Sequence, residues 1–370
     1  MNTTIEREAL ARALSRAQGV IDKRHAMAVL TNVLLEADDG KLCLIASDIE
    51  VSLRQSIPAT IGEPGKAAVP ARTLFEIVRE SSSEEITLTS LENHWMTVSA
   101  GKSQFKLMGV SPEEHPGMPT TKANGETRTT IEIPAGDLNE MIRRTVFAVS
   151  TDDTRSNLAG VYLIGGEGES VRMVATDGHR LAMIDRSVGG DGIGDGVILP
   201  RKGLAEAARL LPEESSSVKL TIAGSEAQVE VGDSLLSMRL VEGSFPDYQR
   251  VIPNETPKRV ALCRDELLST LRRVSILSSE RAKGVRFKLS EGALEISTNN
   301  PDMGEANEEI AVEYGGDAIE VGFNARYLLD VLGVLPEGEK VELGLGDELS
   351  PGVLRGDDSS YTYVVMPMRI

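Results

Sequence analysis

The chain contains one unit three times, and this repeat limits the possible folds more than any other feature. Each repeat begins with an amphipathic helix, because its apolar residues recur at helical spacing. The apolar stripes of the three helices are Ala9, Leu10, Ala13, Leu14 and Ala17; Leu138, Met141, Ile142 and Val149; and Leu267, Leu268, Leu271 and Val274.

Further elements follow in the same order within every repeat. A pair of strands comes first, joined by acidic, Gly-rich turns; the pairs are 33–35 with 42–48, 161–163 with 171–177, and 285–287 with 294–300. A second helix then begins within 69–74, 199–204 and 323–328, preceded by proline in the first two repeats. Proline suits a helix start because its missing N–H has no helical partner there. Last strands are expected at 104–108, 237–241 and 363–367.

The repeat spacing predicts three domains of α+β class with antiparallel sheets. Leu138 follows Leu10 by 128 residues, and Leu267 follows Leu138 by 129. A third of the 370 residues is an ordinary size for one domain. Because polar, proline-bearing stretches occur near 119–126 and 253–257, we place the domains at 1–124, 125–254 and 255–370.

The distribution of charge matters more than its total. A net charge of −18 argues against nucleic acid, because phosphate binding needs basic residues. However, the six predicted helices together carry +5, which leaves −23 on the strands and loops. A molecule with a basic helical face and acidic remaining surfaces can surround DNA loosely without binding it elsewhere.

Two helical positions are basic in all three repeats. They are Arg16, Arg144 and Arg273 in the first helix, and Arg72, Lys202 and Arg326 in the second. A solvated helix face is the simpler interpretation of any one of them, but threefold recurrence favours a shared function. We therefore predict loose contacts with DNA phosphates from Arg16, Arg24, Arg72, Arg144, Lys202 and Arg273.

The densest polar motif, Thr176–Ala182, has two interpretations. Asp177 followed by Gly178 favours a turn, and the other repeats end the same strand with Ser47-Asp48 and Asn299-Asn300. A hydrolase or nuclease that uses Asp177 and His179 is the alternative, but no third catalytic group accompanies them. We favour a recognition turn and predict no catalytic residue.

No cofactor or metal site is predicted. The four histidines (His25, His94, His115 and His179) are not at ligand spacing from one another or from a cysteine. The stretch 189–196 is rich in glycine, but it precedes a strand and contains aspartates, so a surface loop is expected instead of a phosphate cradle.

The C-terminal residues are apolar to the end, whereas termini are usually polar. The segment 361–370 reads Tyr-Thr-Tyr-Val-Val-Met-Pro-Met-Arg-Ile. It suits a last core strand, and its methionines equally suit an adaptable groove for partners. Both interpretations remain open from the residues alone.

Nothing in the sequence indicates a membrane or an oxidising compartment. No apolar run reaches the roughly 20 residues that span a bilayer, and the N-terminus lacks the pattern of a signal peptide. Cys43 and Cys263 have no CxxC spacing, which favours reduced thiols. We expect a cytoplasmic protein.

Over its full length the chain resembles the bacterial DNA polymerase III beta subunits. The matching motifs are Thr176–Ala182, Gly243–Val251, Gly322–Leu332 and Tyr363–Arg369. The resemblance implies a DNA sliding clamp, a non-catalytic processivity factor that encircles duplex DNA without regard to sequence. It also implies a ring-shaped, head-to-tail homodimer of clamp-fold domains, with the helices on the inner face and the sheets outside. The implied partners are the polymerase catalytic subunit, the clamp loader, and other polymerases and repair proteins that carry a clamp-binding motif.

The resemblance also assigns residues to sites. A peptide pocket between the second and third domains would use Leu158, Thr176, Gly178, His179, Arg180, Leu181, Pro246, Arg250, Val251, Asn324, Tyr327, Val364, Val365, Met366, Pro367, Met368 and Arg369. The dimer interface would bring together Phe105, Leu107, Ile276 and Leu277. Some relatives touch DNA near 151–157, but this segment is acidic and polar here, so we expect no such contact.

One alternative from a different class remains. An acidic repeat adaptor that never meets DNA would share the same repeats and the same net charge. Retention on circular DNA would distinguish the clamp from the adaptor.

Overall fold

A computed structural model describes residues 1–21, 27–119, 128–152, 154–190, 193–194, 196–212, 216–279 and 283–369. The chain divides into two compact units. Unit 1 comprises 1–139, 188–192 and 202–240, and unit 2 comprises 140–187, 193–201 and 241–370. The second repeat therefore contributes strands to both units.

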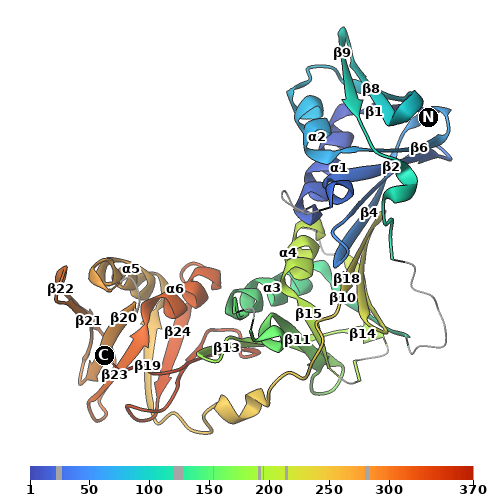
Figure 1. Ribbon diagram of the computed structural model, residues 1–370. Helices are drawn as coiled ribbons and strands as arrows, with labels where there is room; N and C mark the ends of the chain where they lie inside the picture. The colour runs from blue at the N-terminus through green and yellow to red at the C-terminus, as the bar shows by residue number, and fades with distance from the viewer. Residues whose placement is uncertain are drawn as a thin grey trace. The chain divides into compact units, whose positions relative to one another are not determined.

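The helices begin where the apolar periodicity predicts them. Among the described residues, the α-helices are α1 (Arg7–Val20), α2 (Ala71–Glu80), α3 (Ala135–Thr145), α4 (Arg201–Leu210), α5 (Arg264–Val274) and α6 (Ala325–Val334). Pro70 and Pro200 directly precede α2 and α4, and the side chain of Asn324 caps α6 by accepting the Arg326 amide at 2.9 Å. In unit 1, α1 packs against α2, and in unit 2, α5 packs against α6 (Figure 1).

Unit 1 contains two antiparallel sheets. The larger runs β14 (Gly189–Gly190), β10 (Arg128–Pro134), β16 (Ser217–Ala223), β17 (Glu226–Val231), β18 (Ser234–Arg239), β4 (Val51–Pro58), β3 (Lys41–Ser47), β2 (Asn32–Asp38) and β6 (Gly65–Pro70). The smaller runs β5 (Thr60–Glu63), β1 (Asn2–Glu6), β7 (Glu85–Ser90), β8 (Trp95–Ala100) and β9 (Ser103–Met108). The β4–β18 pair joins the first repeat to the second. We call this pair, with the turn Ser47–Val51, the first junction.

Unit 2 is built in the same way. Its larger sheet runs β15 (Val197–Pro200), β11 (Gly160–Gly165), β12 (Ser170–Thr176), β13 (Arg180–Ser187), β26 (Tyr361–Val365), β25 (Gly352–Arg355), β24 (Lys340–Leu345) and β19 (Lys258–Cys263). The smaller runs β22 (Gly304–Ala311), β21 (Ala293–Asn300), β20 (Gly284–Ser290) and β23 (Ile319–Asn324). The β13–β26 pair joins the second repeat to the third. With the turn Thr176–Arg180, it forms the second junction.

Most residues of the predicted apolar stripes are core residues, but Ala9 is half-buried and Val149 lies beyond the end of α3. Leu10 and Leu14 are fully buried and pack with strand residues such as Leu35 and Leu44. In the third repeat, the rings of Phe287 and Phe323 meet edge to face at 5.5 Å. Burial of these side chains provides the main driving force for folding.

The α+β class and its antiparallel sheets are confirmed. The domain borders remain predictions, because the compact units divide the second repeat instead of separating the repeats. The first border falls within 120–127, outside the described residues.

Candidate functional site

The turn of the second junction is a preformed loop. The Oδ1 atom of Asp177 accepts the amides of His179 and Arg180 at 2.9 and 3.1 Å, and the Thr176 hydroxyl accepts the amide of Gly178 at 3.1 Å. Gly178 has a φ of +87°, a conformation that favours glycine. Because the Asp177 carboxylate is used in holding the turn, the geometry supports the recognition turn over the hydrolase.

Arg180 anchors this turn to α6. Its guanidinium is 8% exposed, ion-paired to Asp177 at 3.1 Å and to Asp330 at 2.6 Å, and donates to the Phe147 carbonyl at 2.7 Å. It also lies over the Tyr327 ring, 4.5 Å from the centroid. Burial opposes the charge of Arg180, but the surrounding groups outweigh it and raise the pKa. Arg180 is therefore a positioning residue.

Aromatic and tail residues form one wall beside the turn. The rings of His179 and Tyr327 lie nearly parallel, with centroids 6.4 Å apart, and the Tyr363 hydroxyl donates to the Tyr327 carbonyl at 2.8 Å. The amide of Met366 donates to the His179 carbonyl at 2.9 Å, and that of Met368 to the Gly322 carbonyl at 2.9 Å. The tail is thus held by its backbone.

The core-strand interpretation of the C-terminal segment is confirmed for its first half, and the groove interpretation stays a prediction for the second half. Tyr361–Val365 is the buried strand β26, whereas Met366, Pro367 and Met368 are half-buried and Arg369 is exposed. A backbone held on both sides, with half-buried methionines, offers an apolar surface that adapts to its ligand.

An apolar cluster lies under this surface. Val174, Leu181, Val353 and Val364 are buried together, and Tyr162, Met183, Phe245, Tyr248 and Ile252 pack against them. The rings of Tyr162 and Phe245 stack 4.8 Å apart, almost parallel. Sequence reasoning quoted Gly243–Val251 as a motif but selected Pro246, Arg250 and Val251 from it, and so missed the aromatic residues that contact the cluster.

The other predicted pocket residues lie around this arrangement. Leu158 is buried, Asn324 is half-buried at the start of α6, and Pro246, Arg250 and Val251 are exposed. Arg250 is ion-paired with Asp247 at 2.7 Å. The structure therefore brings together the turn, the tail and Tyr327, and leaves Arg250 directed to a neighbouring carboxylate.

A polar pocket of about 570 Å³ lies beside the turn. Its lining includes His179, Tyr327, Arg201, Lys283 and Arg326, together with carboxylates and part of the segment 151–157. In that segment Asp152 accepts hydrogen bonds from the side chain and backbone of Thr154, which lower the pKa of its carboxyl.

The predicted DNA-contacting residues differ in how freely their charges are presented. Arg72 and Arg273 are exposed, but they are ion-paired with Glu76 and Glu308, while Lys202 is 38% exposed and pairs with Asp48. These three cationic side chains therefore already have carboxylate partners. Arg24 lies outside the described residues.

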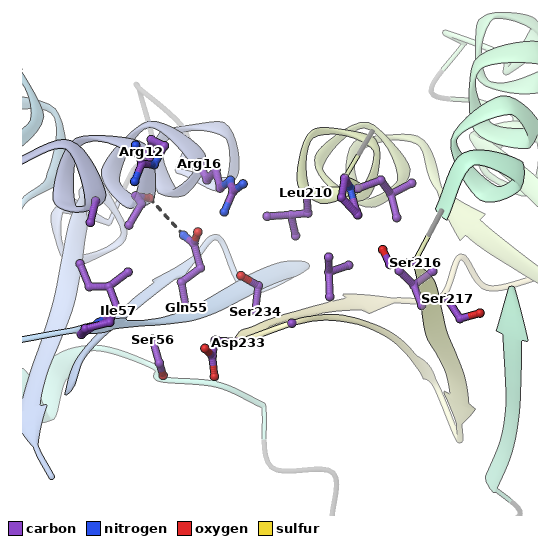
Figure 2. A pocket seen from close by; sticks show the side chains of 18 residues that line it. Arg12, Arg16, Gln55, Ser56, Ile57, Leu210, Ser216, Ser217, Asp233 and Ser234 are labelled. Atoms are coloured by element: carbon purple, nitrogen blue, oxygen red, sulfur yellow. Dashed lines mark hydrogen bonds between the residues drawn. The ribbon is translucent and has the colours of Figure 1, made fainter. Parts of the chain in front are cut away.

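Arg16 is exposed and has no ion pair among the described residues. With Arg12, it lines a pocket of about 570 Å³ between α1 and the end of α4 (Figure 2). Inside this pocket the buried Gln55 side chain donates to the Ala13 carbonyl at 3.1 Å. Of the predicted contacts that the structure describes, Arg16 thus has the guanidinium most available to a phosphate.

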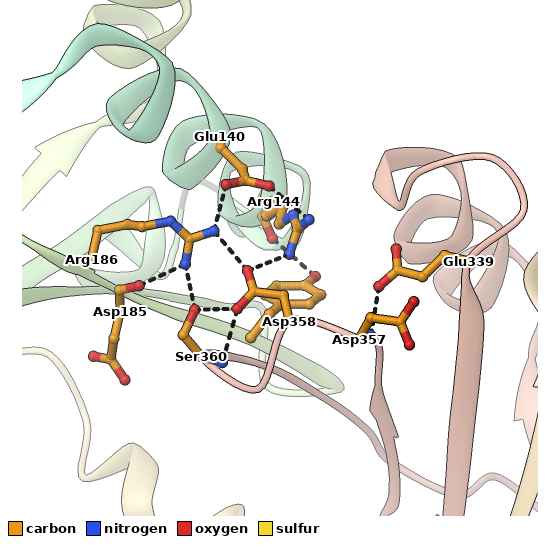
Figure 3. A network of polar contacts seen from close by, with 9 residues as sticks. Glu140, Arg144, Asp185, Arg186, Glu339, Asp357, Asp358 and Ser360 are labelled. Carbon is orange, nitrogen blue, oxygen red and sulfur yellow. Dashed lines mark hydrogen bonds and ion pairs between the residues drawn. The ribbon is translucent and has the colours of Figure 1, made fainter. Parts of the chain in front are cut away.

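The prediction for Arg144 is corrected by its burial. Its side chain is 3% exposed, pairs with Glu140 at 2.7 Å and Asp358 at 2.9 Å, and lies over the Tyr361 ring. Arg186 joins the same carboxylates in one network (Figure 3). A guanidinium enclosed in this way cannot reach a phosphate.

Two neighbouring arginines that the sequence reasoning did not select are exposed on these helices. Arg143 and Arg272 are exposed, whereas Arg144 is buried. Each of the two lies one residue before the predicted basic position of its helix. The sequence indicates this position only weakly: in the aligned helices it is arginine in the second and third repeats but serine (Ser15) in the first.

The proposed interface residues are only partly accessible. Phe105 is 41% and Ile276 69% exposed, and Leu277 is half-buried. Leu107, in contrast, is 8% exposed and belongs to the core of the first repeat.

No group of three His, Cys, Asp or Glu residues within the described ranges is arranged to hold a metal ion. No helix within the same ranges is long and apolar enough to cross a bilayer.

Comparison with known proteins adds independent evidence. Family models of the DNA polymerase III beta subunit match in order: the N-terminal domain over 1–119, the central domain over 132–247 and the C-terminal domain over 249–369. The beta sliding clamps of Pseudomonas aeruginosa and Escherichia coli K12 are 38% and 36% identical to this chain, each covered over 100% of both chains.

Solved structures agree with these matches. The beta sliding clamp of Caulobacter crescentus superposes with a TM-score of 0.91 at 35% identity, and that of Bartonella birtlesii, bound to griselimycin, with 0.94 at 32%. Both comparisons cover 100% of each chain. The repeats, the fold and full-length similarity together exclude the hydrolase and the adaptor, and the chain belongs to the bacterial beta sliding clamps, the non-catalytic processivity subunits of DNA polymerase III.

Proposed function

We propose that two copies of this chain close head to tail into a ring around duplex DNA, with the helices on the inner face. The observation that carries this proposal is a pair of open sheet edges at opposite ends of the repeat order. Strand β9 ends one sheet in the first repeat, and β22 ends another in the third. Exposed strand edges associate readily unless another chain covers them.

The two edges are complementary in chemistry. Strand β9 exposes Phe105 and Met108 beside Lys106, and β22 exposes Glu305 and Glu309. Large exposed apolar side chains next to opposite charges favour a specific protein interface. We propose that β9 of one protomer pairs with β22 of its partner, with Phe105 and Leu107 near Ile276 and Leu277.

Within the ring, processivity would come from topology and not from affinity. Arg16, Arg24, Arg72, Lys202 and Arg273 would make loose phosphate contacts, without Arg144. Because several of these cations already have carboxylate partners, each contact would be weak and readily exchanged, which suits sliding.

The second junction would capture the linear motif of the polymerase, of the clamp loader and of other clamp-binding proteins. A preformed turn, a backbone-held tail and an apolar cluster offer the anchors that peptide recognition uses. Burying apolar peptide side chains on this cluster would provide most of the affinity.

The ring is tested by comparing circular and linear DNA. After loading with a clamp loader and ATP, the clamp should stay on nicked circular DNA at high salt and leave once that DNA is linearised. A closed ring can leave only by an end, whereas an electrostatic binder loses both substrates as salt rises. Equal salt sensitivity on the two DNAs contradicts the proposal.

The peptide site is tested by deleting Met366–Ile370. Polymerase stimulation should be lost, because the surface that faces the ligand is removed, while dimerisation persists. A chain lacking only Ile370, which is not among the predicted pocket residues, serves as the control and should keep most of the activity. Loss of the dimer on the longer deletion, measured by sedimentation, would show that the tail is structural instead.

A further inference from the structure

The two junctions share one backbone design, although only the second is proposed to bind peptides. At the first junction, Asp48 Oδ1 accepts the amides two and three residues later at 3.1 and 2.6 Å; at the second, Asp177 Oδ1 does the same at 2.9 and 3.1 Å. Each turn is also tied to a helix of the following repeat, by Asp48–Lys202 and by Arg180–Asp330. The chain therefore contains a structural counterpart of the peptide site.

The middle of the turn differs between the junctions. The Ser47 hydroxyl accepts the amide of Ile49 at 3.1 Å, as Thr176 accepts that of Gly178 at 3.1 Å. Ile49 has a φ of +79°, close to the +87° of Gly178. A β-branched residue rarely adopts this conformation, so the local fold imposes a strained isoleucine where the other turn has glycine. Its side chain is 53% exposed.

The paired strand residues beside the turn differ as well. At the second junction Leu181 lies directly opposite Val364, and both belong to the apolar cluster. At the first junction the equivalent pair is Ser52 opposite Ser237, and both are buried. The two pairs are equivalent, because Ser52 follows Asp48 by the same number of residues as Leu181 follows Asp177.

The buried serines are already engaged with protein groups. The Ser52 hydroxyl bonds to that of Ser47 at 2.8 Å, and the Ser237 hydroxyl donates to Glu226 at 3.3 Å. A depression of about 320 Å³ lies here, lined by Ile49, Ser52, Ser237, Glu226 and other residues. Its serine hydroxyls and the Glu226 carboxylate make this lining more polar than the aliphatic pair Leu181 and Val364.

An apolar peptide side chain would bind poorly in this depression. It would remove water from the Glu226 carboxylate and the serine hydroxyls without offering them hydrogen bonds in exchange, which opposes binding. Ile49 would also project a branched side chain at the rim, where Gly178 has only a hydrogen atom.

We propose that Ile49, Ser52 and Ser237 keep partner peptides out of the first junction, so that each protomer presents one peptide site instead of two. The inference rests on the proposed function of the second junction. The three residues act as specificity determinants: they exclude the apolar motif from a backbone frame that could otherwise receive it.

Griselimycin is a suitable probe, since it is bound in the solved clamps of Bartonella birtlesii and Pseudomonas aeruginosa. Calorimetric titration of the full chain should give one griselimycin per protomer. The Ile49→Gly/Ser52→Leu/Ser237→Val variant should gain a second, weaker site. The wild-type chain binding two per protomer, or a folded triple variant binding only one, overturns the inference.

The reverse exchange keeps the test decisive if the triple variant does not fold. Leu181→Ser/Val364→Ser should weaken griselimycin binding by about tenfold or more, because apolar contact is replaced by hydroxyl groups. Unchanged binding in this folded variant overturns the inference. The Met366–Ile370 deletion separates the two proposals. If this deletion leaves griselimycin binding intact, the proposed peptide site is wrong. If the deletion abolishes binding but the reverse exchange has no effect, only the inference about the first junction fails.

Discussion

The first and second junctions have the same backbone and different side-chain chemistry. In both, a strand of one repeat pairs with the last strand of the next, and an aspartate closes the turn between two strands. The first junction is held by one partly exposed ion pair, Asp48–Lys202, whereas the second is held by the buried Arg180. The comparison shows that two copies of a repeat can keep the same backbone turn while their side chains make different interactions.

The buried charge explains why the second junction should be the more sensitive to substitution. Arg180 is almost inaccessible to water and contacts two carboxylates, a carbonyl and an aromatic face. If it is removed, Asp177 and Asp330 lose a common partner. Lys202, in contrast, keeps part of its hydration.

The largest predicted effect is therefore that of Arg180→Ala. It should lower the free energy of unfolding by about 3 kcal/mol, because it removes the buried guanidinium and leaves two half-buried carboxylates without their common cation. Lys202→Ala is the matched control at the first junction and should cost no more than about 1 kcal/mol, because its ion pair is partly solvated. Urea unfolding of both variants measures the difference. Equal losses would mean that the two junctions are held alike.

The two turns should respond in opposite directions to exchange of their central residue. Gly178→Ala should destabilise by about 1–2 kcal/mol, because its φ is +87° and a Cβ would come within 3.0 Å of the Arg155 guanidinium. Ile49→Gly should stabilise by up to about 1 kcal/mol, since it relieves a strained φ. Thermal unfolding measures both changes. Destabilisation by Ile49→Gly would show that its side-chain contacts outweigh the strain.

The smallest predicted effect concerns His115, which directly precedes Pro116 and Gly117 in the lining of the depression at the first junction. Burial lowers the pKa of its imidazole below 6.5, and its Nδ1 atom accepts the Gly117 amide at 3.1 Å. The unfolded chain binds a proton more readily than the folded one. Stability from this group is therefore present above pH 6.5 and lost as the pH falls through the folded pKa.

We expect a decrease in Tm on the order of one or two degrees between pH 7 and pH 5.5 from this residue. His115→Gln should remove that part of the pH dependence. Glutamine is a suitable replacement because it is polar and does not titrate. A pH profile identical in the variant and the wild type would exclude a contribution from His115.

Much of the fold followed from the sequence alone. The helix starts after Pro70 and Pro200, the strand pairs and the threefold order were all predicted, because apolar periodicity and proline geometry act locally. The family motifs also located the turn Thr176–Ala182 and the tail Tyr363–Arg369. Each of these depends on residues close together in the chain.

Only the tertiary structure decided which equivalent residues share a role. Arg16 and Arg144 occupy the same helical column, but Arg16 is exposed, whereas Asp358, 214 residues away from Arg144, helps to bury that guanidinium. The aromatic floor at Phe245 and the strained Ile49 were likewise invisible to periodicity. The physical reason is that burial and ion pairing depend on neighbours brought from distant parts of the chain, whereas repeat spacing records only local order.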